Sequence, residues 1–247
     1  MNRQLIIDKL NTFLQTSDFQ DYCVNGLQVE GTSTVCRAVT GVSASRRLFE
    51  EAVTRGAQLV VVHHGLFWKG GPHPFHLTGI MMERIRTLLC NGINLAVYHL
   101  PLDAHPEIGN NAMLLKTLGM ERTEPFDVGF ISRLKTPLQP GDLQKRLDAL
   151  LPDPCRMYGD TAGTIASIAV VSGGGASLLE KAGRLGIDAF ITGEPSEPSV
   201  RSAEEWGVCF LSTGHYNSER FGPIALAEAI RSMFGIPCDF VDVPNAV

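Results

Sequence analysis

Residues 38–65 read AVTGVSASRRLFEEAVTRGAQLVVVHHG, and a related stretch occurs later in the chain. Residues 168–194 read IAVVSGGGASLLEKAGRLGIDAFITGE, and each stretch consists of a β-like run, a helical pattern and a second β-like run. The residues that match are Leu48 with Leu178, Glu50 with Glu180, Ala52 with Ala182, and Gly56 with Gly186. The repeat predicts an α/β fold of two similar domains that arose by internal duplication.

Residue types that bind metal ions follow the β-like runs of both copies. His63 and His64 end the first copy, and they align with Gly193 and Glu194 of the second. A further pair with identical spacing follows the next β-like run in each half; these pairs are His99-x-x-x-Asp103 and His215-x-x-x-Glu219. The same placement in both halves indicates a shared function for these positions.

Length and local composition place the domain boundary in the middle of the chain. A chain of 247 residues has room for two domains of ordinary size. Gly119 is a good helix terminator, and the polar segment ERTEPFD that follows it is turn-prone. The sequence therefore predicts a first α/β domain over residues 1–124 and a second over residues 125–247.

Alternating patterns along the chain predict the individual elements. Helices are expected near 3–15, 45–55, 80–91, 109–118, 141–150, 175–185, 197–206 and 223–234. Strands are expected near 36–42, 58–62, 93–98, 126–134, 166–172, 187–192, 208–213 and 238–242. The stretch LPDPCRMYGDTAG, residues 151–163, is rich in proline, glycine and aspartate and predicts a surface loop.

Bulk properties exclude several classes of protein. A net charge of −5 provides no basic surface for phosphates, which argues against duplex nucleic-acid binding. No apolar run reaches about 18 residues, which argues against a membrane span. Six cysteines without a C-x-x-C pair, mostly in apolar contexts, indicate reduced core residues. Without an export signal at the N-terminus, the cytoplasm is the expected compartment.

The adjacent histidines of VVVHHG favour a dinuclear metal site. Successive side chains of a strand point to opposite faces, so His63 and His64 cannot easily chelate one ion. At the carboxyl end of a strand they can instead reach two neighbouring ions, and ligands collect at such ends in parallel sheets. The alternative is that both imidazoles make ordinary structural hydrogen bonds.

The two pairs with a spacing of four are expected in loops or at helix starts. Pro101 disfavours a helix at the preceding residue, which places His99 and Asp103 on a loop between a strand and a helix. Pro223 suits the first turn of a helix, so that helix is expected to begin near residues 218–222, with Glu219 at or just before its start. A carboxylate there can alternatively serve only the helix dipole.

Imidazoles combined with carboxylates, without thiolates, suit zinc, manganese or iron in a catalytic site. Two such ions generate hydroxide from water near neutral pH, so hydrolysis is the expected reaction class. Other features carry weaker signals. SGGGAS at 172–177 is either an anion-binding or a simple tight turn, and Trp68 is either a stacking platform or a core residue. His73, His76 and His105 are expected at the surface or behind the site.

Several motifs together resemble one known family. They are DYCVNGLQVEG, VVVHHGLFWKG, YHLPLDAHPEIGNNA, DAFITGE and GHYNSER, and they cover nearly the whole chain. The chain resembles the GTP cyclohydrolase 1 type 2 homologues, most closely their short bacterial members, because it lacks the large central insertion of longer members. The resemblance implies two similar α/β domains, a dinuclear metal centre in the cleft between them, and a homohexameric ring.

The resemblance also implies roles for individual residues. The metal ligands carried over from the family are His63, His64, Asp103, His215 and Glu219, which would hold two divalent ions per chain. His99 and Glu194 match the pattern as groups that orient a ligand or shuttle a proton.

Two main functions compete at this point, and the acidic net charge counts against a third, a ring-shaped factor that processes nucleic acid. The first is a metal-dependent hydrolase that acts on a purine nucleotide or related small molecule, with GTP cyclohydrolase action as the specific candidate. The alternative is a non-catalytic protein that binds or delivers metal, or a ring-shaped scaffold. Ready release of the ions to an acceptor would favour the alternative.

Overall fold

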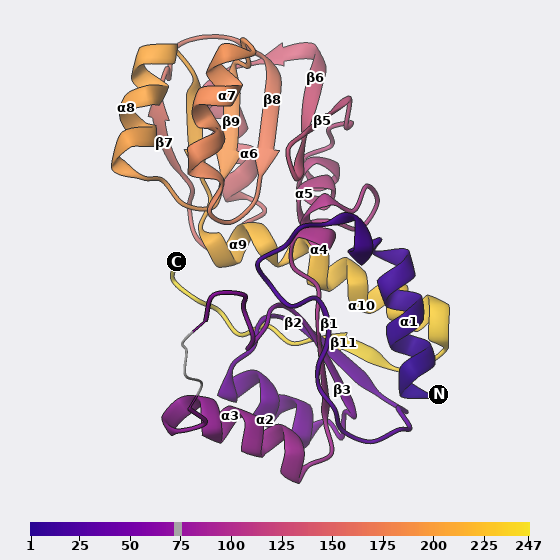
Figure 1. Ribbon diagram of the computed structural model, residues 1–247. Coiled ribbons are helices and arrows are strands. Elements are labelled where there is room, and N and C mark those ends of the chain that lie inside the picture. The colour runs from indigo at the N-terminus through magenta and orange to yellow at the C-terminus, as the bar shows by residue number, and fades with distance from the viewer. Residues whose placement is uncertain (72–75) are drawn as a thin grey trace. The chain divides into compact units, whose positions relative to one another are not determined.

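The computed structural model of the protein describes residues 1–71 and 76–247. The chain divides into two compact units, the first made of residues 1–102 and 222–243, the second of residues 103–221 and 244–247. Both units are mixed α/β structures, each built around its own sheet (Figure 1).

These units differ from the expected single division after residue 124. Helix α5 (Asn110–Thr117) belongs to the second unit, because Leu114 and Leu115 pack in the core of the second sheet. Strand β11 (Cys238–Phe240) belongs to the first unit, because it pairs in parallel with β2 (Ala38–Ser43). The chain thus returns to its first sheet near its end, which local composition does not reveal.

The first unit contains a five-stranded sheet in the order β1-β4-β3-β2-β11. Its other strands are β1 (Gly26–Val29), β3 (Leu59–His64) and β4 (Asn94–Val97). Only β1 runs antiparallel to its neighbour. Helices α2 (Arg46–Thr54) and α3 (Gly79–Cys90) lie on one side of this sheet, and α1 (Arg3–Phe13) and α10 (Phe221–Phe234) lie on the other (Figure 1). A short 3-10 turn, Thr16–Asp18, follows α1.

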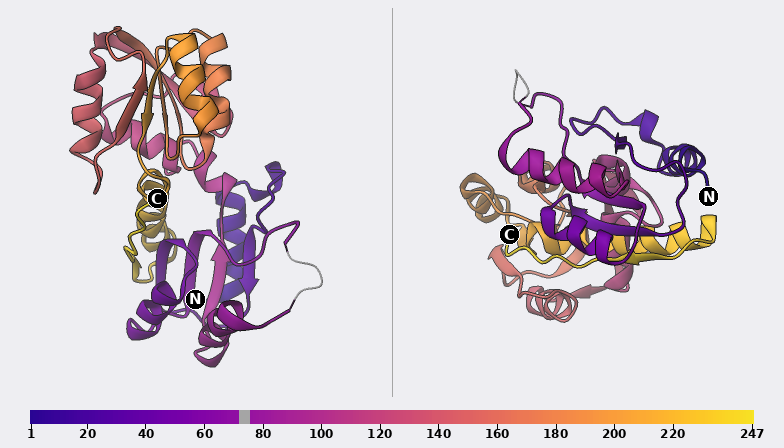
Figure 2. Two further views of the ribbon diagram at one scale, coloured as in Figure 1. Left: turned by 90° about the vertical axis from the view of Figure 1, so that its left-hand side faces the viewer. Right: turned by 90° about the horizontal axis from the view of Figure 1, so that it is seen from below.

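The second unit contains a six-stranded sheet in the order β5-β6-β8-β9-β10-β7. Its strands are β5 (Glu124–Phe126), β6 (Gly129–Leu138), β7 (Arg156–Gly159), β8 (Ile165–Val171), β9 (Ala189–Thr192) and β10 (Cys209–Ser212). Helix α6 (Pro140–Asp148) covers one face; α7 (Leu179–Arg184), preceded by the 3-10 turn Gly175–Leu178, and α8 (Glu197–Trp206) cover the other (Figure 2). The short helices α4 (Leu100–Ala104) and α9 (His215–Glu219) complete the chain.

The two copies of the sequence repeat fold in the same way. Strands β2, β3 and β4 are parallel neighbours in the first sheet, as β8, β9 and β10 are in the second. Gly56 and Gly186 end the intervening helices with φ angles of 64° and 65°. This left-handed conformation favours glycine, which explains why the glycine recurs.

A side chain in each copy also joins two strands at the same position. Gln58 Oε1 accepts hydrogen bonds from the backbone N–H groups of Cys36 and Arg37, at 2.9 and 3.1 Å. Asp188 Oδ2 accepts from the N–H groups of Ala166 and Ser167, at 2.9 and 2.8 Å. In the alignment of the two copies, the accepting side chains match each other and so do the donating N–H groups. The two copies therefore correspond in structure also at positions where their residues differ.

Most expected elements are confirmed, two expectations are wrong, and one strand was not expected. Residues 151–163 are not only a loop, because Arg156–Gly159 forms β7 and pairs antiparallel with β10. The strand expected near 126–134 is a hairpin of β5 and β6, turned at Asp127, whose φ is 56°. Strand β1 was not expected at all. Short strands among turn-forming residues carry too little periodicity to be recognised.

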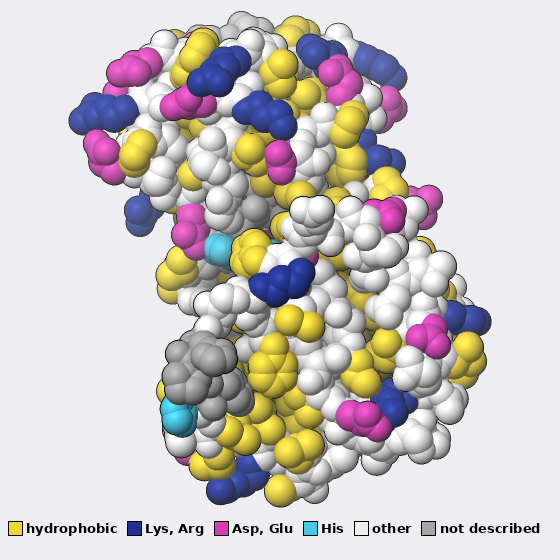
Figure 3. All heavy atoms as spheres, in the orientation of Figure 1, with side chains coloured by type: hydrophobic (Ala, Val, Ile, Leu, Met, Phe, Trp, Pro, Cys, Tyr) yellow, Lys and Arg dark blue, Asp and Glu magenta, His cyan; other side chains and the backbone are white. Residues whose placement is uncertain are grey.

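Surface and core features follow the sequence in most respects. Four of the six cysteines are buried, but Cys36 and Cys90 are exposed, contrary to their apolar sequence context. On the face shown in Figure 3, Lys and Arg side chains are mixed with Asp and Glu over the second unit, where α7 and α8 carry ion pairs such as Arg184–Glu180. No helix in the described part of the chain is long and apolar enough to cross a bilayer.

Candidate metal centre

Three imidazoles of the first unit gather at the carboxyl ends of two parallel strands. His63 and His64 are the last residues of β3, and His99 follows the neighbouring β4. The ring centroids lie 4.5 Å apart for His63 and His64 and 4.9 Å apart for His63 and His99. One nitrogen from each of the three rings lies within 4.8 Å of the others. Parallel pairing of β3 and β4 therefore gives the first unit three potential metal donors.

The protein engages the Nδ1 atom of each ring. His63 Nδ1 lies 3.1 Å from the carbonyl oxygen of Tyr98, and His99 Nδ1 lies 3.0 Å from Asp21 Oδ1. Both oxygens only accept hydrogen bonds, so both Nδ1 atoms donate, and in a neutral ring Nε2 is then the atom that carries the lone pair. His64 Nδ1 lies 3.0 Å from the Ser43 hydroxyl, which can donate or accept. Such contacts behind the ring are typical of metal-binding histidines.

Asp21 is the organising residue of this region, and the sequence did not single it out. Its Oδ1 atom also accepts from the N–H of Cys23 at 2.9 Å, and its Oδ2 atom accepts from Asn25 Nδ2 and the N–H of Leu100 at 2.9 and 3.0 Å. Burial raises the pKa of Asp21, but the hydrogen bonds from His99 and Asn25 hold it well below its usual range. The carboxylate thus stays ionised and fixes the orientation of His99.

Aromatic side chains border the imidazoles. Tyr22 and Trp68 are stacked with centroids 5.4 Å apart, and the His99 ring lies 5.2 Å from Trp68 in an edge-on arrangement. Trp68 is half-buried and packs against the hydrophobic core, whereas Tyr22 is exposed. Gln28 Oε1 holds the loop after β3 by accepting from the N–H groups of Leu66 and Phe67. Trp68 therefore borders the imidazoles from a loop that Gln28 holds by hydrogen bonds.

In the second unit, His215 lies between two carboxylates. Its Nδ1 atom is 2.6 Å from Glu194 Oε1, and its Nε2 atom is 3.1 Å from Glu219 Oε2. Burial lowers the pKa of His215, but Glu219 and Glu194 outweigh it and raise this pKa to about 9. His215 and Glu219 are the first and last residues of α9. Helix α10 begins at Phe221, so Glu219 lies just before its start, as expected, but the short helix α9 that Glu219 ends was not expected.

Asp103 is held by three polar residues that sequence reasoning missed. Its Oδ1 atom accepts from Asn110 Nδ2 at 2.9 Å and from the Ser172 hydroxyl at 3.0 Å. Asn111 links the same groups, since its Oδ1 atom accepts from the N–H of Ser172 at 2.7 Å and its Nδ2 atom donates to the carbonyl of Asp103 at 3.2 Å. The signals in the sequence were the EIGNNA motif for the two asparagines and the SGGGAS stretch for Ser172. Asp103 itself lies in helix α4, which tolerates Pro101 in its first turn, so the loop expected there is wrong.

The glycine-rich turn after β8 makes room for Glu219. A Cβ atom on Gly173 would lie 2.0 Å from Glu219 Oε1, and the φ of Gly173 is 63°. The N–H groups of Gly173 and Gly175 donate to Ser218 Oγ and Thr192 Oγ1, at 2.9 and 3.0 Å. This turn thus supports a carboxylate position and directs these amides to protein oxygens.

His76, His105 and the cysteines lie outside this set. His76 is exposed, and His105 is buried with its Nδ1 atom accepting from the N–H groups of Glu107 and Ile108. His73 lies outside the described residues. Burial is the main cause that raises the pKa of each buried thiol to about 12; these thiols are Cys23, Cys155, Cys209 and Cys238. Imidazoles and carboxylates, rather than thiolates, are therefore the available donors, and these residue types fit a divalent first-row metal ion.

Comparisons with known proteins match one family over nearly the whole chain. Residues 1–245 match the model of the family described as Duf34/NIF3 (NGG1p interacting factor 3). Proteins named GTP cyclohydrolase 1 type 2 homolog are 44% identical in Escherichia coli K12 and 41% identical in Pseudomonas aeruginosa PAO1. These alignments cover 98% and 97% of this chain and 96% of each relative.

Solved structures share the fold over the whole chain. The protein ybgI, described as of unknown function, is 41% identical with a TM-score of 0.95, and TTHA1606 from Thermus thermophilus is 36% identical with a TM-score of 0.92. Both alignments cover 100% of each chain. Reduced HcgD from Methanocaldococcus jannaschii, at 21% identity and a TM-score of 0.86 over 98% of both chains, shares the fold. The chain described here belongs to the Duf34/NIF3 family.

Proposed function

We propose that the protein is a metal-dependent hydrolase with a dinuclear centre that acts on a small molecule. The proposed ligands are His63, His64, Asp103, His215 and Glu219. The observation that carries the proposal is the group of three imidazoles at the ends of β3 and β4, which bring one nitrogen each within 4.8 Å of one another, while Nδ1 of two of them donates to a protein oxygen.

The chain's own residues hold the ligands in position. Tyr98 and Ser43 orient His63 and His64, and Ser172 and Asn110 orient Asp103. Bound ions would supply hydroxide near neutral pH and would polarise a carbonyl, amidine or phosphoryl group. Because the orienting contacts are already made within each unit, little rearrangement of side chains is needed within either unit for binding.

His99 and Glu194 are proposed to act beside the ligands. The Nδ1–H of His99 donates to Asp21, so its Nε2 atom is the one that can accept a proton from water or substrate. Glu194 holds the Nδ1 side of His215. His99 is therefore the candidate proton acceptor, and Glu194 is a positioning residue.

Ring opening of GTP is the specific reaction proposed. The relatives carry the name GTP cyclohydrolase 1 type 2 homolog, and opening a purine ring is hydrolysis of a cyclic amidine, which metal-activated water can perform. The stacked pair of Tyr22 and Trp68 beside His99 offers an aromatic surface for a flat heterocycle. A homohexameric ring, as the family resemblance implies, is proposed with it.

Metal content is the first test. Elemental analysis of protein purified without chelators is expected to give about two ions per chain, as the ligand number suggests for a dinuclear site. Asp103→Ala and Glu219→Ala should each lose metal, whereas Asp142→Ala, on the exposed surface of α6, should keep it. Protein without metal even after reconstitution would refute the proposal.

Turnover and metal release separate the two candidate functions. The metal-replete protein should convert GTP or another cyclic amidine, and Asp103→Ala should abolish that conversion. Rapid transfer of the ions to a chelator or acceptor protein, without turnover of any nucleotide or cyclic amide, would instead support metal delivery. Native mass spectrometry tests the proposed hexamer.

A further inference from the structure

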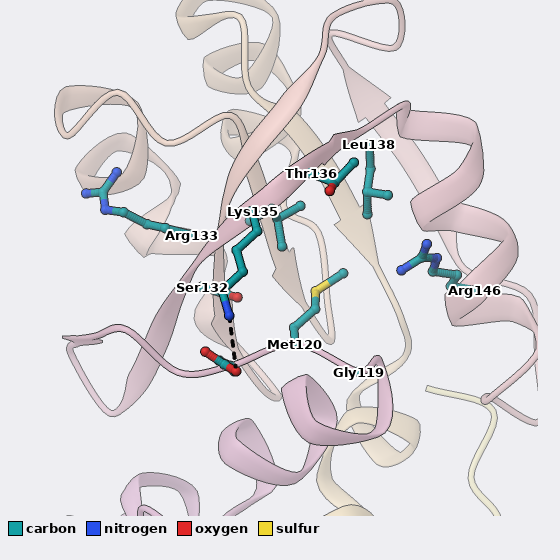
Figure 4. A pocket seen from close by; sticks show the side chains of 10 residues that line it. Gly119, Met120, Ser132, Arg133, Lys135, Thr136, Leu138 and Arg146 are labelled. Atoms are coloured by element: carbon teal, nitrogen blue, oxygen red, sulfur yellow. Dashed lines mark ion pairs between the residues drawn. The ribbon is translucent and has the colours of Figure 1, made fainter.

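A cavity of about 320 Å³ lies in the second unit, lined by residues other than the candidate metal ligands. Its walls are the segment Gly119–Glu121, residues of β6 between Ser132 and Leu138, and Arg146 on α6 (Figure 4). Its volume is at the lower end of the range of small-molecule sites. The cavity is lined by both polar and apolar side chains, so a matching ligand has a polar part and an apolar part.

One polar atom of the cavity wall has no partner. Ser132 is 1% exposed, and its hydroxyl makes no hydrogen bond within the described residues. A buried hydroxyl without a partner is uncommon, because its desolvation is not compensated. Ser132 lies on β6 and lines the cavity. An acceptor atom of a ligand in the cavity would give this hydroxyl the hydrogen-bond partner that it lacks.

Cationic side chains border the same space. Arg146 makes no ion pair among the residues that the structure describes, and Figure 4 shows its guanidinium directed toward the cavity. Lys135 pairs with Glu121 at 3.8 Å, but both side chains are at least 80% exposed, so the pair is weak. Arg133 points away from the cavity and pairs with Glu124. The cavity therefore offers one uncommitted and one weakly committed positive charge.

The strand that forms the wall is irregular at this place. Strand β6 is in register with β8 up to Arg133 and again at Leu138, and β5 pairs only with Gly129–Ile131. The intervening residues 134–137 are therefore out of register with both neighbours. Such irregularities redirect side chains and are frequent beside binding sites. Here the irregular segment brings the hydroxyl of Thr136 and the apolar side chains of Leu134 and Leu138 to the cavity wall.

We propose that this cavity binds a small organic anion that joins one oxyanion group to a short apolar body. The Ser132 hydroxyl donates to the oxyanion, and Arg146 and Lys135 supply its counter-charge. Met120, Leu134 and Leu138 contact the apolar body. The cavity is too small for a nucleoside triphosphate, and its charges suit a carboxylate or a phosphate monoester. The site is a second ligand site, and it stands whether or not the metal centre is catalytic.

Calorimetric titration of the full-length protein tests this proposal. The probes are isovalerate, acetate and inorganic phosphate at constant ionic strength. Isovalerate is expected to bind saturably with a Kd on the order of 1 mM, and more tightly than acetate, because only isovalerate fills the apolar part. Phosphate that binds more tightly than acetate would identify the oxyanion as a phosphate monoester; weaker binding would identify it as a carboxylate.

Variants locate the binding. Ser132→Ala and Arg146→Gln should each weaken isovalerate binding by about tenfold, since each removes a charge-assisted hydrogen bond. Lys145→Gln is the matched control, because Lys145 is the preceding residue of α6 and does not line the cavity. Absence of saturable binding would overturn the proposal. So would equal binding by wild type, Ser132→Ala and Arg146→Gln, which would place the anion elsewhere, for example on the metal ions.

Discussion

The two units share a framework but end it with different chemistry. Gln58 and Asp188 join the same pair of strands in each copy, and Gly56 and Gly186 end the same helix. At the strand ends, the first unit presents three imidazoles, one of which is oriented by a buried carboxylate, whereas the second presents one imidazole between two carboxylates. Residues within the sheets are restrained by the pairing of neighbouring strands. Residues at the strand ends lie beyond this pairing, so their types can differ between the two units.

The largest expected effect distinguishes the two carboxylates that orient an imidazole. Asp21→Ala should lower the free energy of unfolding of metal-free protein by about 3 kcal/mol, because four donors lose a buried acceptor. Glu194→Ala should cost less than about 1 kcal/mol, because the side chain of Glu194 is 42% exposed. Urea denaturation measures both. Equal losses in the free energy of unfolding would show that the two carboxylates contribute equally to stability despite their different burial.

The next comparison concerns the side chains that join the strands. Asp188→Ala should cost about 2–3 kcal/mol and Gln58→Ala about 1 kcal/mol, because hydrogen bonds to a charged acceptor are stronger. Asp188 also accepts from the Ser167 hydroxyl at 2.8 Å. Hydrogen exchange should accelerate at the amides of Ala166 and Ser167 in one variant and of Cys36 and Arg37 in the other. Unchanged exchange at these amides would mean that these contacts do not hold the strands.

Glycine in the turn after β8 provides a third comparison. Gly173→Ala should cost about 2 kcal/mol, from the left-handed backbone and the displaced Glu219 carboxylate, and should reduce metal content. Gly186→Ala has the same backbone requirement, with no atom within 4 Å of the added Cβ, and should retain metal. Denaturation and elemental analysis of both variants separate backbone strain from loss of the carboxylate. Full metal content in Gly173→Ala would exclude a requirement for Glu219 in its present position.

The smallest effect tests the equivalence of the two copies. Gly56→Ala and Gly186→Ala should each cost about 1 kcal/mol, because both positions are left-handed and both have open space around the added Cβ. Denaturation under identical conditions should give the same value within error. A clear difference in the free energy of unfolding would mean that the two copies share their strand order but not the local energetics of these turns.

Local patterns predicted the regular elements well, and contacts distant in sequence account for the failures. The helix expected near 197–206 is α8, because Ser196 forms a capping box at its start and Gly207 ends it. Strand β7 was hidden among prolines and glycines, since it is stabilised by pairing with β10 and not by its own pattern. The candidate ligand His63 was recognisable from its position after VVV, but its carbonyl partner at Tyr98 was not.

The sequence by itself determined the α/β class, the repeat and the positions of the metal-binding residue types. Hydrophobic periodicity, turn-forming residues and the spacing of His and carboxylate residues are local properties that can be seen in the sequence. Only the tertiary structure decided that Asp21 orients His99, that Ser172, Asn110 and Asn111 hold Asp103, and that β11 returns to the first sheet. These contacts join residues far apart in the chain. Their geometry depends on strand order and register, which no local pattern encodes.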